Sequence, residues 1–160
     1  SVIPFFLQKA RDGSLPITDP QMTRFNISLD EGVKLVLWAM NNSYGGEILV
    51  PKIPSYRIMD VADAIGPSCE KIIVGTRPGE KIHEEMITIS DSVTTYDLGE
   101  VYAILPADDH VLTKYKESQI NISPVSDQFV YNSGTNPNFL TVAELRNLIR
   151  EHVDPSFHPH

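Results

Sequence analysis

The stretch "KIIVGTRPGEK", residues 71–81, joins an apolar run to a tight, charged corner. The apolar run is typical of a buried strand, and Pro78 and Gly79 are residues that turns favour. A turn needs neither Arg77 before them nor Glu80 after them. Taken alone, the corner is compatible with a solvated connection and with a binding site.

Helical and extended patterns alternate on both sides of this stretch. Strands are expected at "LPIT" (15–18), "RFNI" (24–27), "EILVP" (47–51), "KIIVG" (71–75), "VYAILP" (101–106) and "QFVYN" (128–132). Helices are expected at "VIPFFLQKA" (2–10), behind Ser28, at "RIMDVADAIG" (57–66), at "KIHEEMI" (81–87) and at "LTVAELRNLIREHV" (140–153). This alternation predicts an α/β or α+β fold.

Two of the expected helices begin with a capping box, in which a hydroxyl residue precedes a glutamate by three positions. The pairs are Ser28 with Glu31 and Thr141 with Glu144. Behind Ser28, apolar residues recur with helical spacing: Leu29, Val33, Val36, Leu37 and Met40. In the expected helix 57–66, the residues expected to face inward are Ile58, Val61, Ala62 and Ile65. The sequence predicts one lobe over 1–152 and a flexible tail over 153–160.

Composition limits the classes of partner and the compartment. Thirteen basic against twenty-one acidic side chains give a net charge of −8, which argues against nucleic acid as a partner. No apolar stretch is long enough to span a membrane, and the start is not typical of a signal peptide. With a single cysteine, Cys69, a reducing cytoplasm is the expected compartment. Because the chain opens on apolar residues without an initiator Met, it is expected to be part of a longer protein.

Motifs for self-sufficient catalysis are missing from the sequence. The glycines never take the spacing G-x-G-x-x-G, and no Tyr is followed four residues later by Lys. The histidines lack the spacing of metal ligands, and the neighbours Glu84 and Glu85 are interpreted as solvated surface. We therefore expect no catalytic residue and no metal site in this chain.

Three cationic segments follow or join expected strands, where α/β proteins place ligands. One carries Arg24, a second carries Lys52 and Arg57, and the third is the corner at Arg77 and Glu80. Arginine offers a planar pair of donors that suits a diphosphate, and a carboxylate suits the hydroxyls of a ribose. The corner thus matches adjacent parts of a nucleoside diphosphate, whereas Lys52 and Arg57 are interpreted as surface.

Four strings carry a resemblance to a known family. They are "SVIPFF" (1–6), "LPITDPQMTRF" (15–25), "GGEILVPKIPSYRIMDVADAI" (45–65) and "KIIVGTRPGEKIHEEMI" (71–87). Together they resemble the C-terminal, substrate-binding part of inverting UDP-N-acetylglucosamine 4,6-dehydratases, which are extended short-chain dehydrogenase/reductase enzymes of bacterial surface-glycan synthesis. The likeness is specific as far as Ile87 and loose beyond it.

This resemblance implies roles for five residues. It implies that Arg77 contacts phosphate and Glu80 ribose, that Thr18 and Val2 line the substrate site, and that Arg24 is directed at a phosphate. It further implies a lyase that uses NADP, whose binding residues belong to an N-terminal Rossmann portion absent here. The chain by itself is then expected to be inactive.

Alternatives remain beside this interpretation. The chain would also fit a stand-alone module that binds nucleotide sugars without catalysis, or the lobe of a related epimerase or dTDP-glucose dehydratase. In the complete enzyme the partners would be a UDP-sugar and the Rossmann portion. Without that portion an apolar face with Val2, Ile3, Phe5 and Phe6 is expected to be exposed, which predicts a homo-oligomer.

Overall fold

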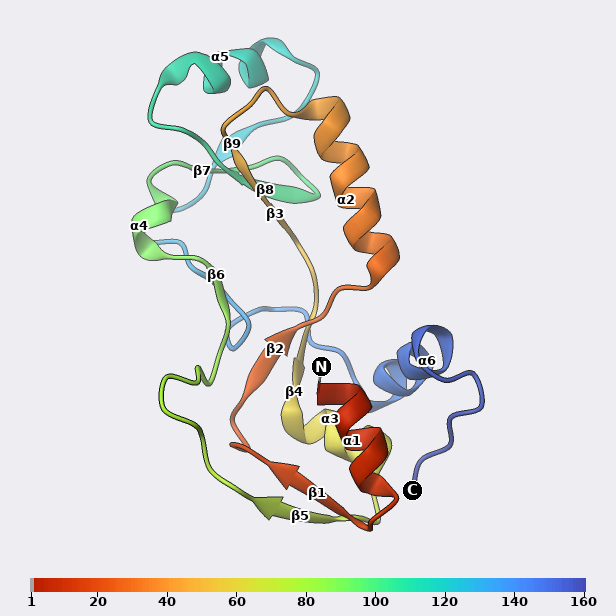
Figure 1. Cartoon of the computed structure of the whole chain (residues 1–160). Helices are drawn as coiled ribbons and strands as arrows, with labels where there is room; N and C mark the ends of the chain where they lie inside the picture. Colours follow the sequence, from red (N-terminus) through yellow and green to blue (C-terminus); the bar gives the residue numbers. More distant parts are fainter. Residues whose placement is uncertain (1) are drawn as a thin grey trace. The chain divides into compact units, whose positions relative to one another are not determined.

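The computed structural model describes residues 2–160, which form two compact units (Figure 1). Unit 1 comprises Ser1–Asn26, Pro54–Glu84 and Ser133–His160, and unit 2 comprises Ile27–Ile53 and Glu85–Asn132. The sequence predicts a single lobe instead. Periodicity shows that a segment has an apolar side, but it does not show which of two cores buries that side.

Unit 1 combines three helices with two short sheets. Its helices are α1 (Val2–Ala10), α3 (Ile58–Ile65) and α6 (Val142–His152), and its strands are β1 (Ser14–Ile17), β2 (Thr23–Phe25), β4 (Ser55–Arg57) and β5 (Glu70–Ile73). Strands β1 and β5 pair in parallel and lie side by side at the bottom of Figure 1, whereas β2 and β4 pair antiparallel. The unit therefore has the mixed α/β architecture that the sequence predicts.

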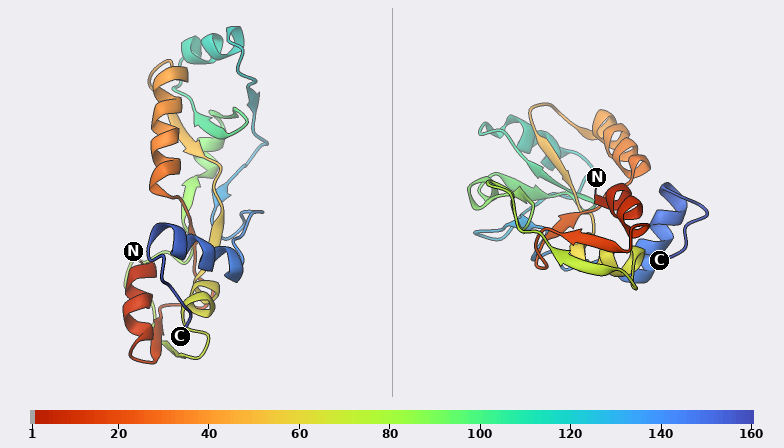
Figure 2. Two further views of the ribbon diagram at one scale, coloured as in Figure 1. Left: turned by 90° about the vertical axis from the view of Figure 1, so that its right-hand side faces the viewer. Right: turned by 60° about the horizontal axis from the view of Figure 1, so that its bottom comes forward.

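The core of unit 1 lies among β1 and the three helices. Leu15 and Ile17 of β1 are fully buried, and they pack with residues of α1, α3 and α6. Figure 2 shows α3 and α6 next to each other, in agreement with their contacts. All four residues predicted to face inward on α3 are buried, which confirms that prediction: Ile58, Val61, Ala62 and Ile65.

The C-terminal segment 153–160, predicted to be a flexible tail, packs onto unit 1. The side chain of Phe157 is only 4% exposed and belongs to the core. The backbone N–H of His160 donates to the carbonyl of Ile65 at 2.9 Å, and its carbonyl accepts from the N–H of Ser68 at 3.2 Å. One buried aromatic ring and two backbone hydrogen bonds thus hold a segment whose polar composition is typical of disorder.

Unit 2 is built around a four-stranded sheet in the order β3-β8-β7-β9. Its elements are α2 (Leu29–Asn42), β3 (Ile48–Pro51), β6 (Glu85–Ile87), α4 (Ile89–Ser92), β7 (Thr95–Asp97), β8 (Val101–Ile104), α5 (Asp109–Glu117), β9 (Ser123–Pro124) and β10 (Tyr131–Asn132). A second pair joins β6 to β10. The core gathers Ala103, Val111 and Tyr115, and Leu35 and Trp38 of α2 pack against it.

The apolar stripe that predicts α2 faces outward. The capping box of Ser28 and Glu31 is present, so the start of the helix is confirmed. However, Leu29 is 84% exposed and Met40 is 78% exposed, and the other stripe residues, Val33, Val36 and Leu37, are exposed as well. The opposite side of the helix, with Trp38, meets the core.

Two further expectations about apolar surface are wrong. The run expected to be a buried strand has Ile72, Ile73 and Val74 exposed, because within residues 2–160 β5 pairs with β1 alone. On α1, by contrast, Phe6 is buried and Val2 and Ile3 are partly buried against the core, so that Phe5 alone of the four expected residues is exposed. Runs of exposed apolar residues lie on α2 and along β5.

The segment 81–87 is not the helix that its pattern predicts. Its last three residues, Glu85–Ile87, form strand β6, and the residues before them have no regular structure. The helix over 140–153 is confirmed as α6, including the capping box of Thr141 and Glu144. Segment 81–87 forms no helix because residues within it contact β2 and Ser133 at the candidate site.

Candidate functional site

Two adjoining cavities in unit 1 define the candidate site. The first has a volume of about 330 Å³ and the second about 530 Å³. Their linings share five residues, Val2, Phe5, Pro16, Thr18 and Glu80, so that they form one continuous hollow between α1, β1 and the corner. Together they fall in the size range of small-molecule sites.

All five residues singled out in the sequence line this hollow. Val2, Thr18 and Glu80 border both cavities, Arg24 borders the first cavity, and Arg77 borders the second. They come from α1, from the end of β1, from β2 and from the loop after β5. These residues lie up to 78 positions apart in the sequence, and a solvated turn would not require them to line one hollow. Their convergence favours a binding site at the corner over a solvated connection.

The corner is a tight turn closed at both ends. The N–H of Glu80 donates to the carbonyl of Arg77 at 3.0 Å, and Gly79 has φ 80°, as a type II turn with Pro78 before the glycine requires. The N–H of Arg77 donates to Oε2 of Glu80, also at 3.0 Å. One carboxylate oxygen thus stabilises the turn, and the same carboxylate borders both cavities.

The guanidinium of Arg77 is exposed and free for a ligand. Among residues 2–160 it makes no ion pair and no side-chain hydrogen bond. An arginine whose backbone is fixed and whose guanidinium is unpaired can donate two parallel N–H hydrogen bonds to one anion. The turn places that head beside the second cavity.

Thr18 is positioned by the turn that ends β1. The Oδ1 atom of Asp19 accepts from the N–H of Gln21 at 2.7 Å, and the carbonyl of Asp19 accepts from the N–H of Met22 at 3.1 Å. An Asp followed by Pro20 is typical of such a turn. The chain therefore reverses directly behind Thr18 and leaves it on the wall of the hollow.

Arg24 is anchored more firmly than Arg77. Its Nη1 donates to the carbonyl of Thr23 at 2.7 Å and to that of Ile82 at 3.0 Å, and its Nε lies 3.8 Å from Oε1 of Glu84. The other oxygen of Glu84, Oε2, accepts from the N–H of Phe25 at 2.8 Å. The guanidinium is consequently held in one orientation at the wall of the first cavity.

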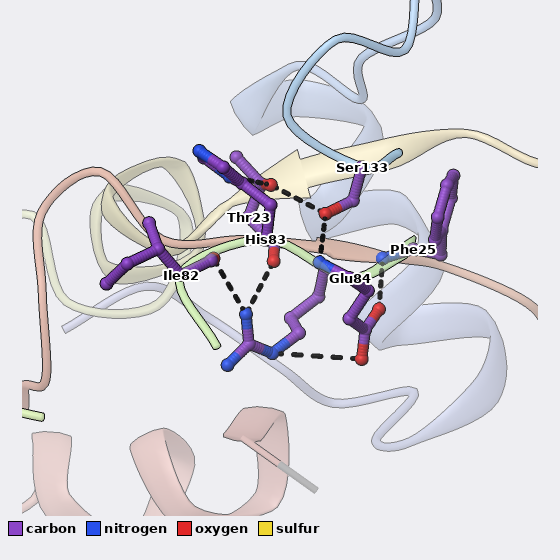
Figure 3. Close-up of polar contacts among 7 residues, drawn as sticks. Thr23, Phe25, Ile82, His83, Glu84 and Ser133 are labelled. Atoms are coloured by element: carbon purple, nitrogen blue, oxygen red, sulfur yellow. Dashed lines mark hydrogen bonds and ion pairs between the residues drawn. The ribbon is translucent and has the colours of Figure 1, made fainter. Parts of the chain in front are cut away.

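A buried polar network supports this arrangement (Figure 3). Oγ1 of Thr23, which is 4% exposed, lies 2.8 Å from Nδ1 of His83 and 2.7 Å from Oγ of Ser133. That Oγ also accepts from the N–H of Glu84 at 2.9 Å. A Cβ on Gly134 would meet the His83 ring at 2.7 Å, so a glycine is needed there. These contacts tie His83 and Glu84 to residues of β2 and to Ser133, which explains why they form no helix.

The sequence pattern does not indicate the roles of two residues at the site. Glu84 is interpreted as solvated surface, and its side chain is 46% exposed, but it also accepts a backbone hydrogen bond and lies 3.8 Å from Nε of Arg24. Tyr56 lines the first cavity. No local signal distinguishes either one, because both acquire their neighbours from β2, more than thirty residues away.

Lys52 and Arg57, the other two cations singled out in the sequence, have partners of their own. Lys52 pairs with Asp97 at 2.7 Å, and Arg57 lies 3.5 Å from Asp60 with its guanidinium over the ring of Phe139. Neither borders the two cavities. Their interpretation as surface residues is in agreement with these positions.

The residues of this chain do not form a binding site for the dinucleotide NADP. A dinucleotide needs a strand that leads through a glycine-rich turn into a helix N-terminus. Of the two parallel strands, β1 leads into the turn at Asp19 and β5 into the corner at Arg77, and no helix follows either directly. Within residues 2–160 no cluster of His, Cys, Asp and Glu could hold a metal ion, and no helix is long and apolar enough to cross a membrane.

Comparison with known proteins establishes the family. Residues 1–106 match the model of a family described as "Polysaccharide biosynthesis protein", and the chain belongs to that family. Among its relatives is a protein named UDP-N-acetylglucosamine 4,6-dehydratase (inverting) from Campylobacter jejuni subsp. jejuni serotype O:2. The two are 44% identical over 156 residues, which cover 93% of this chain and 46% of that protein. The resemblance inferred from the four strings is thereby confirmed.

Two further similarities define the wider class. A UDP-glucose 4-epimerase of Rickettsia canadensis is 36% identical over 141 residues, 83% of this chain and 41% of that protein. The X-ray structure of Pen from Bacillus thuringiensis superposes with a TM-score of 0.76 at 27% identity, over 94% of this chain and 45% of that one. The predicted fold class is confirmed, and the chain spans less than half the length of the curated relatives described here.

Proposed function

We propose that this chain binds the UDP moiety of a UDP-N-acetylhexosamine in the cytoplasm and orients the sugar for 4,6-dehydration. The reaction would invert C5 and use NADP held by residues outside this chain. Arg77 contacts phosphate, Glu80 contacts the ribose, Arg24 faces a phosphate, and Val2 and Thr18 line the substrate site. The completed enzyme is a lyase of surface-glycan precursor synthesis.

One observation carries this proposal: the five residues to which the resemblance assigns roles, drawn from different parts of the sequence, border a single hollow in unit 1. Two of them, Arg24 and Arg77, are cationic, and the chain as a whole is strongly acidic. Two guanidinium groups and a carboxylate around one hollow suit a ligand that carries phosphate and hydroxyl groups together. The naming of the relatives as UDP-sugar enzymes supports the same ligand class.

Binding of UDP is the first expected result. Calorimetric titration of the protein as its gene encodes it, with any sequence that precedes Ser1, is expected to show one UDP site per chain. UDP-N-acetylglucosamine should compete for that site, and uridine should compete poorly because it lacks the phosphates that the two arginines would contact. A protein that binds UDP and uridine equally well, or binds neither, would contradict the proposed function.

A UDP-hexose 4-epimerase is the second candidate, because several relatives carry that name. Incubation with NADP and UDP-N-acetylglucosamine separates the two by mass spectrometry. A dehydratase gives a product lighter by one water, whereas an epimerase gives an isomer of equal mass. A stand-alone binding module gives neither product, and the intact mass of the native protein would then match the 160-residue chain alone.

We also propose that the protein associates into a dimer or larger oligomer. The support is the exposed apolar stripe of α2, from Leu29 to Met40. Light scattering at micromolar concentration is expected to give a mass above that of one chain, and Val36→Lys should lower it. Lys34→Ala, on the same helix, serves as the control. A wild-type monomer would contradict this proposal.

A further inference from the structure

Tyr56 occupies a position that connects it to Arg24. Strands β2 and β4 pair antiparallel, and in this register Tyr56 lies directly opposite Arg24. Side chains at opposed positions of an antiparallel pair share one face of the sheet, with Cβ atoms about 5 Å apart. Both residues accordingly line the first cavity.

The hydroxyl of Tyr56 is open to this cavity although the residue as a whole is only 8% exposed. Within residues 2–160 it makes no hydrogen bond to another protein group. Every fully buried side-chain nitrogen or oxygen in that part of the chain does have a partner. The phenolic oxygen is therefore accessible, and the cavity beside Arg24 is where it can meet a ligand.

The hydroxyl remains a donor at neutral pH. Burial raises the pKa of Tyr56 to about 12; the carboxylate of Glu84 acts in the same direction and the guanidinium of Arg24 acts against it. Arg24 can only donate, and its Nη1 and Nε already face protein oxygens. A phenol and a guanidinium that both offer protons suit a negatively charged ligand group with acceptor atoms alone, as a phosphate is.

We propose that Tyr56 is a further ligand-binding residue, whose hydroxyl donates a hydrogen bond to a phosphate oxygen of the bound nucleotide beside Arg24. This inference rests on the nucleotide-binding function proposed above. It extends the site from Arg77 at the corner to a second pair of donors, Arg24 on β2 and Tyr56 on β4. Glu84 is then the positioning residue that keeps Arg24 turned toward that phosphate.

The variant Tyr56→Phe tests this assignment, because it removes one oxygen and keeps the ring in the core. In the protein as its gene encodes it, UDP affinity is expected to fall about tenfold, the range of a hydrogen bond to a charged group. Affinity for uridine, which carries no phosphate, should not change. Tyr96→Phe in unit 2, a partly buried tyrosine that lines neither cavity, is the matched control.

The possible outcomes separate this inference from the proposed function. Equal UDP affinity of wild type and a folded Tyr56→Phe overturns the role of Tyr56 and leaves UDP binding intact. A loss seen only with UDP-N-acetylglucosamine, and not with UDP, places the contact on the sugar and overturns the phosphate assignment. If wild type binds no UDP, the proposed function fails, and inorganic diphosphate becomes the probe. Diphosphate binding that depends on Tyr56 then still supports the anion site, whereas its absence overturns both.

Discussion

Replacing Arg77 with alanine is expected to weaken UDP binding about ten- to hundredfold, the equivalent of one charge-assisted hydrogen-bonded contact. The guanidinium makes no hydrogen bond and no ion pair with residues 2–160, so its removal should leave the melting temperature unchanged. Arg77→Lys should restore little affinity, since a point charge cannot reproduce the planar fork. Calorimetry with UDP, accompanied by thermal melting of each variant, measures both quantities.

Two matched changes sharpen this test. Lys81→Ala removes an exposed cation four residues away that borders neither cavity, so it should leave UDP affinity near the wild-type value. Glu80→Gln keeps an oxygen that can accept from the Arg77 N–H, so the turn should survive with a smaller loss of affinity. If Arg77→Ala is folded and binds UDP as tightly as wild type, Arg77 has no role in the site.

Replacing Phe157 with alanine is expected to lower the free energy of unfolding by about 3–5 kcal/mol, the usual cost of deleting a buried phenylalanine ring. The ring is 4% exposed and packs into the core of unit 1, together with α3 and α6. Urea unfolding followed by circular dichroism measures the loss. Because a whole domain is commonly stable by only 5–15 kcal/mol, the effect should be large.

The neighbouring residue Val153 supplies the control for this prediction. It is 46% exposed, so Val153→Ala should change stability by less than about 1 kcal/mol. If Phe157→Ala were as stable as wild type, the last residues would contribute nothing to the core. The sequence-based expectation of a flexible tail would then be correct and the packing of Phe157 would be refuted.

Local chemistry made several elements predictable from the sequence. The capping boxes at Ser28 and Thr141 involve residues only three positions apart, and both helices begin where these pairs predict. The corner at Arg77 could likewise be recognised as a turn, because Pro78 and Gly79 have conformational preferences of their own. The same residues, together with the four strings, were sufficient to nominate the family and the binding residues.

Burial and partners were decided by the tertiary structure. The stripe on α2 has the correct period, yet Trp38 on the other side meets the core while Leu29 stays exposed, since periodicity defines faces without assigning them. Thr23 lies 60 residues from His83 and 110 from Ser133, and contacts over such separations override the helical pattern of the segment that contains His83.

The sequence by itself determined what depends on near neighbours: where helices begin, where the chain turns, and which charged residues stand at those turns. Only the tertiary structure decided that Arg24 and Tyr56 face one another across β2 and β4. It also decided that Glu84, whose side chain stays 46% exposed, pairs with Arg24. The physical reason is that strand register and side-chain burial depend on the whole fold, whereas capping and turn formation depend on a few consecutive residues.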